Sequence, residues 1–93
     1  INVPLGVMRV SDICWQYMTE LAKLGNASSA SDLAVGAKSL ETGIWGAMKN
    51  VEINLVQIDD EKYKTAVLKE AGEIMARAKK NLAEVEKILN GRN

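Results

Sequence analysis

One face of the segment between residues 31 and 55 combines glycines with polar side chains that could bind a ligand. Its members recur every three or four positions, the spacing that places side chains on one face of an α-helix. They are Asp32, Gly36, Ser39, Gly43, Gly46, Asn50 and Asn54. Each interior glycine costs a helix about 1 kcal/mol relative to alanine, so the glycines need a physical reason. Because glycine has no side chain, a second backbone or a flat ligand can come close to the helix there.

Two interpretations of this small, polar face remain open. In the first, the small residues allow helices to pack closely, and the asparagines hydrogen-bond at a subunit interface. In the second, the face is the wall of a groove, and Asp32, Asn50 and Asn54 bind a polar ligand through their carboxylate and carboxamide groups. The two interpretations are compatible if the groove lies at an interface.

Few other side chains in the sequence could take part in catalysis or bind a metal. There is no histidine, the commonest general acid–base residue and metal ligand, and we predict no metal site. The single cysteine, Cys14, lies among apolar positions, which predicts a buried structural thiol. Trp15 and Trp45 could stack on a ring, but packing between helices is the favoured interpretation. Lys38 could pair with a carboxylate of the ligand, and a solvated surface lysine is the alternative.

Two long helices are predicted in this part of the chain. The first precedes the small, polar face, and the second carries it. The first spans about residues 4–24, with Pro4 in its first turn and Gly25-Asn26 as its end. Its apolar positions are Val7, Val10, Cys14, Tyr17, Leu21 and Leu24. The second spans about residues 29–57 and starts at a capping box of Ser29 and Asp32. Beside its small, polar face it has an aliphatic stripe of Leu33, Ala37, Leu40, Ile44, Ala47, Val51 and Leu55.

A third helix is predicted over about residues 60–90, with Asp59 as its N-cap. Its apolar face includes Tyr63, Val67, Glu70, Ala71, Ile74, Met75, Ala78, Asn81, Leu82, Val85, Ile88 and Leu89. Its other face is charged and is expected to be solvated, with Glu73 and Arg77 as a pair one turn apart. Short loops between long helices make neighbours antiparallel. The fold prediction is therefore all-α, with three antiparallel helices that form a portion of a larger helical bundle.

Composition and charge limit the compartment and the partners. The chain has 93 residues, enough for one small domain, and 12 basic and 12 acidic residues balance to zero net charge. That balance argues against nucleic acid or an anionic membrane as the main partner. No apolar run is long enough to span a bilayer, and one cysteine is typical of a reducing compartment, so a cytoplasmic location is expected. A chain this short with an uncovered helix face is expected to self-associate as a homodimer or higher homo-oligomer.

Short motifs occur along the chain in a defined order. They are Val3–Leu5, Gly25-Asn26, Ser31-Asp32, Leu40-Glu41, Gly46-Ala47, Asn50-Val51, Ile53-Asn54-Leu55 and Asp60. This order resembles the C-terminal part of the formiminotransferase-cyclodeaminase and methenyltetrahydrofolate cyclohydrolase family. The resemblance covers essentially the whole chain, and its most specific part is the run Asn-Val-x-Ile-Asn-Leu.

The resemblance implies an all-helical folate enzyme that works as a dimer or higher oligomer. A tetrahydrofolate derivative would be its substrate, with no cofactor and no metal. The cyclodeaminase reaction closes formiminotetrahydrofolate to methenyltetrahydrofolate and releases ammonia; the cyclohydrolase reaction interconverts methenyl- and formyltetrahydrofolate by addition of water. The resemblance carries Asp32, Asn50 and Asn54 over as pocket or interface residues, and it identifies no general base in this chain.

The family domain is longer than this chain, which sets an expectation about its completeness. We expect residues 1–93 to be the C-terminal fragment of a single cyclodeaminase-type domain, without its upstream half and without turnover on its own. The alternative function is a helical oligomerisation or interaction module without catalytic activity. A four-helix cofactor bundle is disfavoured, because the Glu-x-x-His ligand pairs of such bundles need histidine.

Overall fold

Three α-helices make up the computed structural model, which describes residues 2–24 and 30–91. They are α1 (Asn2–Leu24), α2 (Ala30–Leu55) and α3 (Glu61–Gly91). No strand occurs within those residues, so the all-α prediction with three helices is confirmed. The predicted helix end at Gly25-Asn26 and the predicted helix start at Ser29 lie outside the described residues. The larger bundle stays a prediction.

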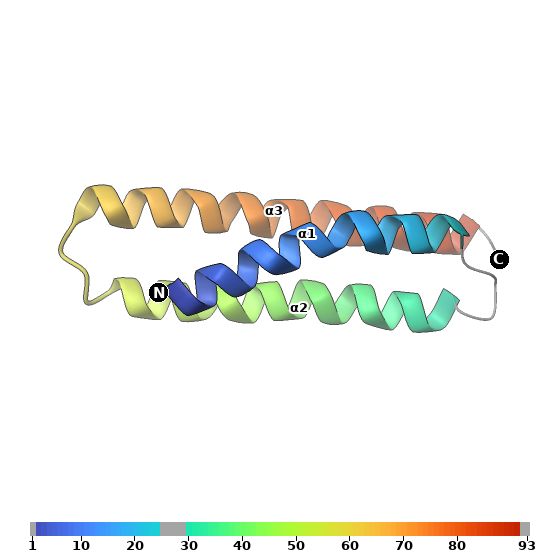
Figure 1. Ribbon diagram of the computed structural model, residues 1–93, viewed down its shortest axis with the longest axis horizontal. Coiled ribbons are helices and arrows are strands. Elements are labelled where there is room, and N and C mark those ends of the chain that lie inside the picture. The colour runs from blue at the N-terminus through green and yellow to red at the C-terminus, as the bar shows by residue number, and fades with distance from the viewer. Residues whose placement is uncertain (1, 25–29, 92–93) are drawn as a thin grey trace.

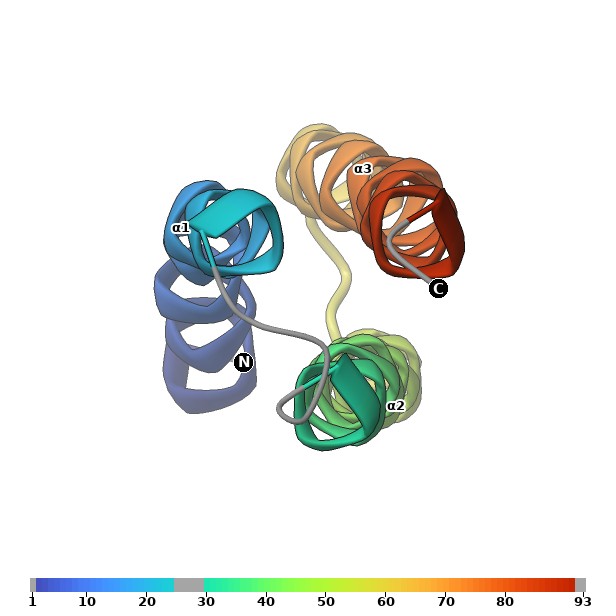
Figure 2. The ribbon, with the colours of Figure 1, turned by 90° about the vertical axis from the view of Figure 1, so that its right-hand side faces the viewer.

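The helices form a rod with principal extents of 51 × 16 × 15 Å. In Figure 1, α1 and α3 run toward the same end of the rod. α2, which lies between them in sequence, runs in the opposite direction. Seen end-on in Figure 2, the three helices occupy the corners of a triangle, and each pair is in contact. Both views show α1 crossing obliquely, from the level of α2 at its N-terminal end to the level of α3 at its C-terminal end. This crossing decides which residues of α1 meet α2.

The connection between α2 and α3 is fixed by backbone and capping hydrogen bonds. The N–H of Ile58 donates to the carbonyl oxygen of Leu55 at 3.0 Å. The N–H of Tyr63 donates to Oδ1 of Asp60 at 3.1 Å, and the N–H of Lys64 donates to the carbonyl oxygen of Asp60 at 3.0 Å. Asp60 is therefore the N-cap of α3, and the prediction of Asp59 was wrong by one residue. The half-buried side chain of Ile58 packs against the core and sets where the connection ends.

The core is entirely apolar among the described residues. The aliphatic stripe of α2 is confirmed, because it supplies Ala37, Ile44, Ala47, Val51 and Leu55 as buried residues. The apolar face of α3 is confirmed as well, apart from Tyr63, which is exposed. Its buried members are Val67, Ala71, Ile74, Met75, Ala78, Leu82, Val85 and Leu89.

α1 buries a different face from the predicted one. Its buried residues are Leu5, Met8, Trp15 and Ala22, of which the last three recur every seven positions. All six predicted core positions of α1 are exposed, including Cys14, whose thiol lies 3.5 Å from the carbonyl oxygen of Val10. The physical reason is that α1 is apolar on two faces, and the bulky pair Met8 and Trp15 fills the centre of the bundle when its own face turns inward. The prediction of a buried Cys14 was therefore wrong.

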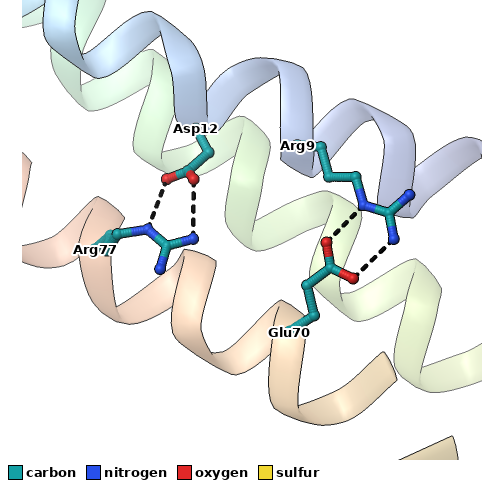
Figure 3. A network of polar contacts seen from close by, with 4 residues as sticks. All are labelled: Arg9, Asp12, Glu70 and Arg77. Carbon is teal, nitrogen blue, oxygen red and sulfur yellow. Dashed lines mark hydrogen bonds and ion pairs between the residues drawn. The ribbon is translucent and has the colours of Figure 1, made fainter. Parts of the chain in front are cut away.

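Two ion pairs hold α1 against α3, as Figure 3 shows. Nε and Nη2 of Arg9 donate to the two carboxylate oxygens of Glu70 at 2.6 and 2.8 Å. Nε and Nη2 of Arg77 donate to the two carboxylate oxygens of Asp12 at 3.2 and 2.9 Å. The predicted partner of Arg77 was Glu73 on its own helix, which is wrong because Asp12 offers two aligned acceptors across the interface. The order of charges is opposite on the two helices, so a shift of α1 along α3 would break both pairs.

The carboxylate of Glu70 provides a test of the α1–α3 contact through pH. The hydrogen bond from Arg9 lowers the pKa of Glu70 from its ordinary value of 4.5. A carboxylate with a lowered folded-state pKa stabilises the fold above its unfolded pKa and loses that contribution as pH falls through the folded value. Glu70→Gln is therefore expected to reduce the free energy of unfolding at neutral pH and to match the unaltered protein in acid.

Urea unfolding at neutral pH and well below pH 4.5 measures this difference. Glu73→Gln is the matched control, since it removes the same charge from an exposed position of α3 that makes no ion pair to α1 in the described structure. Equal losses for the two variants at neutral pH, or a loss for Glu70→Gln that persists in acid, would contradict the assigned role of the pair.

Candidate functional site

A groove of about 430 Å³ lies between the N-terminal part of α1 and the C-terminal half of α2. At this end of the rod, the N-terminal part of α1 lies at the level of α2 (Figure 2). Its lining residues are Val3, Pro4, Val7, Gly43, Gly46, Ala47, Asn50 and Asn54. None of these side chains carries a charge. The groove therefore suits the uncharged part of a ligand.

Two glycines of α2 form the open floor of the groove. A Cβ atom added at Gly43 or Gly46 would meet no atom within 4 Å outside the local helix. A Cβ atom added at Gly36, by contrast, would lie 3.6 Å from Cε of Met18, an ordinary packing distance. Close packing of helices within the chain therefore does not account for Gly43 and Gly46. Their faces are available to a ligand or to another chain.

Asn50 and Asn54 line the groove together, as their spacing predicts. They lie four residues apart on α2, so their side chains project from the same face about one turn apart. Each carboxamide offers an N–H donor and a carbonyl acceptor. Both residues are exposed. The pair can therefore present alternating donors and acceptors to the edge of a ligand.

Asp32 does not lie in the groove. It is exposed in the first turn of α2, where a carboxylate favours the positive end of the helix dipole. Eighteen residues separate it from Asn50, which corresponds to about 27 Å along a helix axis. The structure therefore brings Asn50 and Asn54 together and keeps Asp32 apart, and a binding role for Asp32 stays a prediction.

The remaining candidate side chains lie outside the groove. A second cavity of about 470 Å³ meets it at Gly43 and is lined by Val35, Lys38, Ser39 and Thr42 as well. Nζ of Lys38 lies 3.1 Å from a carboxylate oxygen of Glu41, so this lysine is a paired surface residue. Trp15 is buried, which confirms packing between helices.

Trp45 differs from Trp15 and lies on the surface. Its side chain is exposed, so the prediction of packing between helices was wrong for this residue. Nζ of Lys49 lies 5.6 Å from the centroid of its ring. That distance fits a cation–π contact at the surface of α2.

Sequence reasoning missed the wall of the groove that α1 supplies. Val3, Pro4 and Val7 belong to it, and no spacing within one helix could connect them to residues of α2. The match of Val3–Leu5 to the family motif was the one available signal. Among residues 2–24 and 30–91, no three His, Cys, Asp or Glu side chains are placed to hold a metal ion. Within the same residues, no helix combines the length and the apolar character needed to cross a membrane.

The open floor predicts the effect of adding one methyl group. Gly43→Ala should raise the free energy of unfolding by about 0.5–1 kcal/mol, because alanine favours the helix and its Cβ finds free space. Gly72→Ala on α3 is the control, since a Cβ there also meets nothing within 4 Å and the position lies outside the groove. Thermal unfolding of both variants measures the gains. A loss for Gly43→Ala beside a gain for Gly72→Ala would mean that a second chain already packs on this floor.

Comparison with known proteins identifies the family. Residues 1–73 match the family model described as formiminotransferase-cyclodeaminase. The chain is 48% identical over 92 residues to formimidoyltransferase-cyclodeaminase of Dictyostelium discoideum, which covers 99% of this chain and 17% of that protein. It is 39% identical over 85 residues to the protein of that name from Sus scrofa, which covers 91% of this chain and 16% of that protein. The chain thus spans only 16% and 17% of the length of these two relatives. It belongs to the formiminotransferase-cyclodeaminase family, in which it matches the C-terminal cyclodeaminase domain.

Proposed function

We propose that the groove between α1 and α2 binds a tetrahydrofolate derivative in a full-length cyclodeaminase. The observation that carries this proposal is the uncharged groove with a glycine floor and a pair of carboxamides, within the residues that match the family. The reaction would close formiminotetrahydrofolate to methenyltetrahydrofolate and release ammonia. The names of the relatives favour this reaction over the cyclohydrolase alternative.

The shape of the groove supports a flat ring as the bound group. Gly43 and Gly46 leave room for a flat part of the ligand to approach the backbone of α2. Val3 and Val7 provide an apolar surface on the opposite side. A volume of about 430 Å³ falls in the range that small-ligand sites occupy. In this arrangement, Asn50 and Asn54 hydrogen-bond to the polar groups of the ring.

The lining of the groove also limits what this chain contributes to the reaction. Formation of a ring with loss of ammonia needs groups that donate and accept protons. No residue in the groove titrates, since its lining is aliphatic, glycine or carboxamide. We therefore assign residues 1–93 to binding and orientation of the substrate. The acid–base groups of the reaction would come from elsewhere in the full-length protein, and this chain alone would not turn over substrate.

The carboxamide of Asn50 provides the test of this proposal. In the full-length protein, Asn50→Leu should weaken binding of tetrahydrofolate about tenfold, because the loss of one or two hydrogen bonds costs about 1–1.5 kcal/mol. Titration calorimetry measures the dissociation constant, and size-exclusion chromatography of the same sample verifies the assembly. Asn90→Leu is the control, since it removes an exposed carboxamide at the far end of α3. Unchanged affinity of Asn50→Leu in an intact assembly would exclude Asn50 from the binding site.

The exposed apolar face of α1 supports a second proposal, which concerns assembly. We call this surface the outer α1 face. It consists of Val3, Val7, Val10, Ile13, Tyr17, Leu21 and Leu24, with exposed fractions from 47% to 81%. It follows α1 for about 34 Å, the length of 23 helical residues. An apolar surface of this extent on a small domain marks a binding interface.

We propose that a second copy of the protein covers the outer α1 face. The face is uncharged along its length, so it is complementary to itself in a twofold dimer. The zero net charge of the chain removes long-range repulsion between copies. The same face would serve an oligomerisation module without catalytic activity. The outer α1 face, and not only the small, polar face of α2, is therefore the surface through which we expect self-association.

Two charges introduced into the outer α1 face should separate the copies. Ile13→Lys combined with Tyr17→Lys removes two exposed apolar side chains from each copy, and each such side chain contributes about 1.5–3 kcal/mol when buried. The dissociation constant of the dimer should rise by more than about tenfold. Sedimentation velocity at micromolar concentration measures it, with Leu68→Lys on α3 as the control at another exposed apolar position. A folded monomer of the unaltered protein under these conditions would contradict the proposal.

A further inference from the structure

A third cavity extends the groove toward the end of the bundle. It has a volume of about 390 Å³ and is lined by the start of α1, the end of α2, the connection between α2 and α3, and the first turn of α3. Its lining residues are Asn2, Asn54, Gln57, Ile58 and Tyr63. We call it the end cavity. Asn54 lines both the groove and the end cavity, so one ligand can reach from the first into the second.

The walls of the end cavity are held in place by the connection between α2 and α3. Gln57 lies next to Ile58, whose N–H donates to the carbonyl oxygen of Leu55 at 3.0 Å and whose side chain packs against the core. Tyr63 lies in the first turn of α3, and its own N–H donates to Oδ1 of Asp60 at 3.1 Å. The backbone at Gln57 and Tyr63 is therefore held relative to Asn54 before a ligand binds, which lowers the entropy lost on binding.

The chemistry of the end cavity differs from that of the groove. Three carboxamides, from Asn2, Asn54 and Gln57, surround it together with the phenol of Tyr63. Each carboxamide supplies donors and an acceptor, and the phenol supplies one donor and an acceptor. No lining residue carries a charge, so a carboxylate or phosphate would lose water there without gaining a countercharge. The set is suited to a neutral heterocyclic edge on which donors and acceptors alternate.

We propose that the end cavity binds the polar edge of a ring whose face lies at the Asn50 and Asn54 end of the groove, and that Gln57 and Tyr63 determine how the ring is oriented. Gly46 lies about 12 Å from Asn54 along α2, so the glycine floor faces the rest of the ligand. This inference rests on the proposed folate-binding function of the groove. For a folate-type ligand, the neutral pterin edge enters the end cavity, and the anionic glutamate tail points away from it. Gln57 and Tyr63 are thus specificity-determining residues that contact the ring.

The test separates the ring from the tail of the ligand in the full-length protein. Titration calorimetry with tetrahydropterin, which lacks the tail, and with p-aminobenzoylglutamate, which lacks the ring, reports on each part. Gln57→Leu and Tyr63→Phe should each weaken binding of tetrahydropterin by about tenfold, the effect of losing one or two hydrogen bonds. Binding of p-aminobenzoylglutamate should not change. Tyr63→Phe removes one oxygen atom and keeps the ring, so its effect does not depend on a change in folding.

The outcomes distinguish this inference from the proposed function of the groove. If Asn50→Leu weakens binding of tetrahydropterin while Gln57→Leu and Tyr63→Phe do not, the groove is supported as a binding site and the end cavity is excluded as one. If the two end-cavity variants weaken p-aminobenzoylglutamate as much as tetrahydropterin, the proposed orientation is wrong. If the unaltered full-length protein binds tetrahydrofolate and Asn50→Leu, Gln57→Leu and Tyr63→Phe all leave its affinity unchanged, both proposals fall.

Discussion

The rotation of α1 about its own axis is the constraint on which the rest of the structure depends. α1 is apolar on two faces, and only one of them can enter the bundle. Burial of Met8 and Trp15 supplies the larger free energy, because Arg9 and Arg77 remain at the surface, where solvent screens their charges. The two ion pairs fix the position of α1 along α3. Together with the burial, they determine which residues α1 turns toward α2.

The groove follows from that rotation. With Met8 inside and Arg9 against α3, the first turns of α1 place Pro4 and Val7 beside the glycines of α2. The same rotation turns Val10 and Tyr17 outward. Val3 and Val7 belong to both surfaces, so the groove and the outer α1 face share an edge. A ligand in the groove and a partner on the outer α1 face would therefore meet along one line of residues.

The sequence predicted the faces of α2 and α3 because each of these helices has a single aliphatic stripe. It failed on α1, where periodicity alone gives two equivalent answers, and Cys14 was placed on the wrong one. Asn50 and Asn54 could be paired from their spacing, since four residues make about one turn of a helix. The same stripe included Asp32, because periodicity identifies a face and carries no information on distance along it. The wall formed by Val3 and Val7 depends on how α1 packs on α3. The ion pairs of Arg9 and Arg77 that fix this packing join residues separated by 61 and 65 positions in the sequence, which no local pattern reveals.

The absence of titratable side chains from the lining of the groove has a consequence for kinetics. Neither carboxamides nor aliphatic groups change protonation across the physiological range, so the contacts made by this wall have the same strength in mild acid and mild base. If the groove binds substrate as proposed, a bell-shaped profile of kcat/KM against pH would report on titratable groups that lie outside this lining. The lining itself would add no titration to that profile.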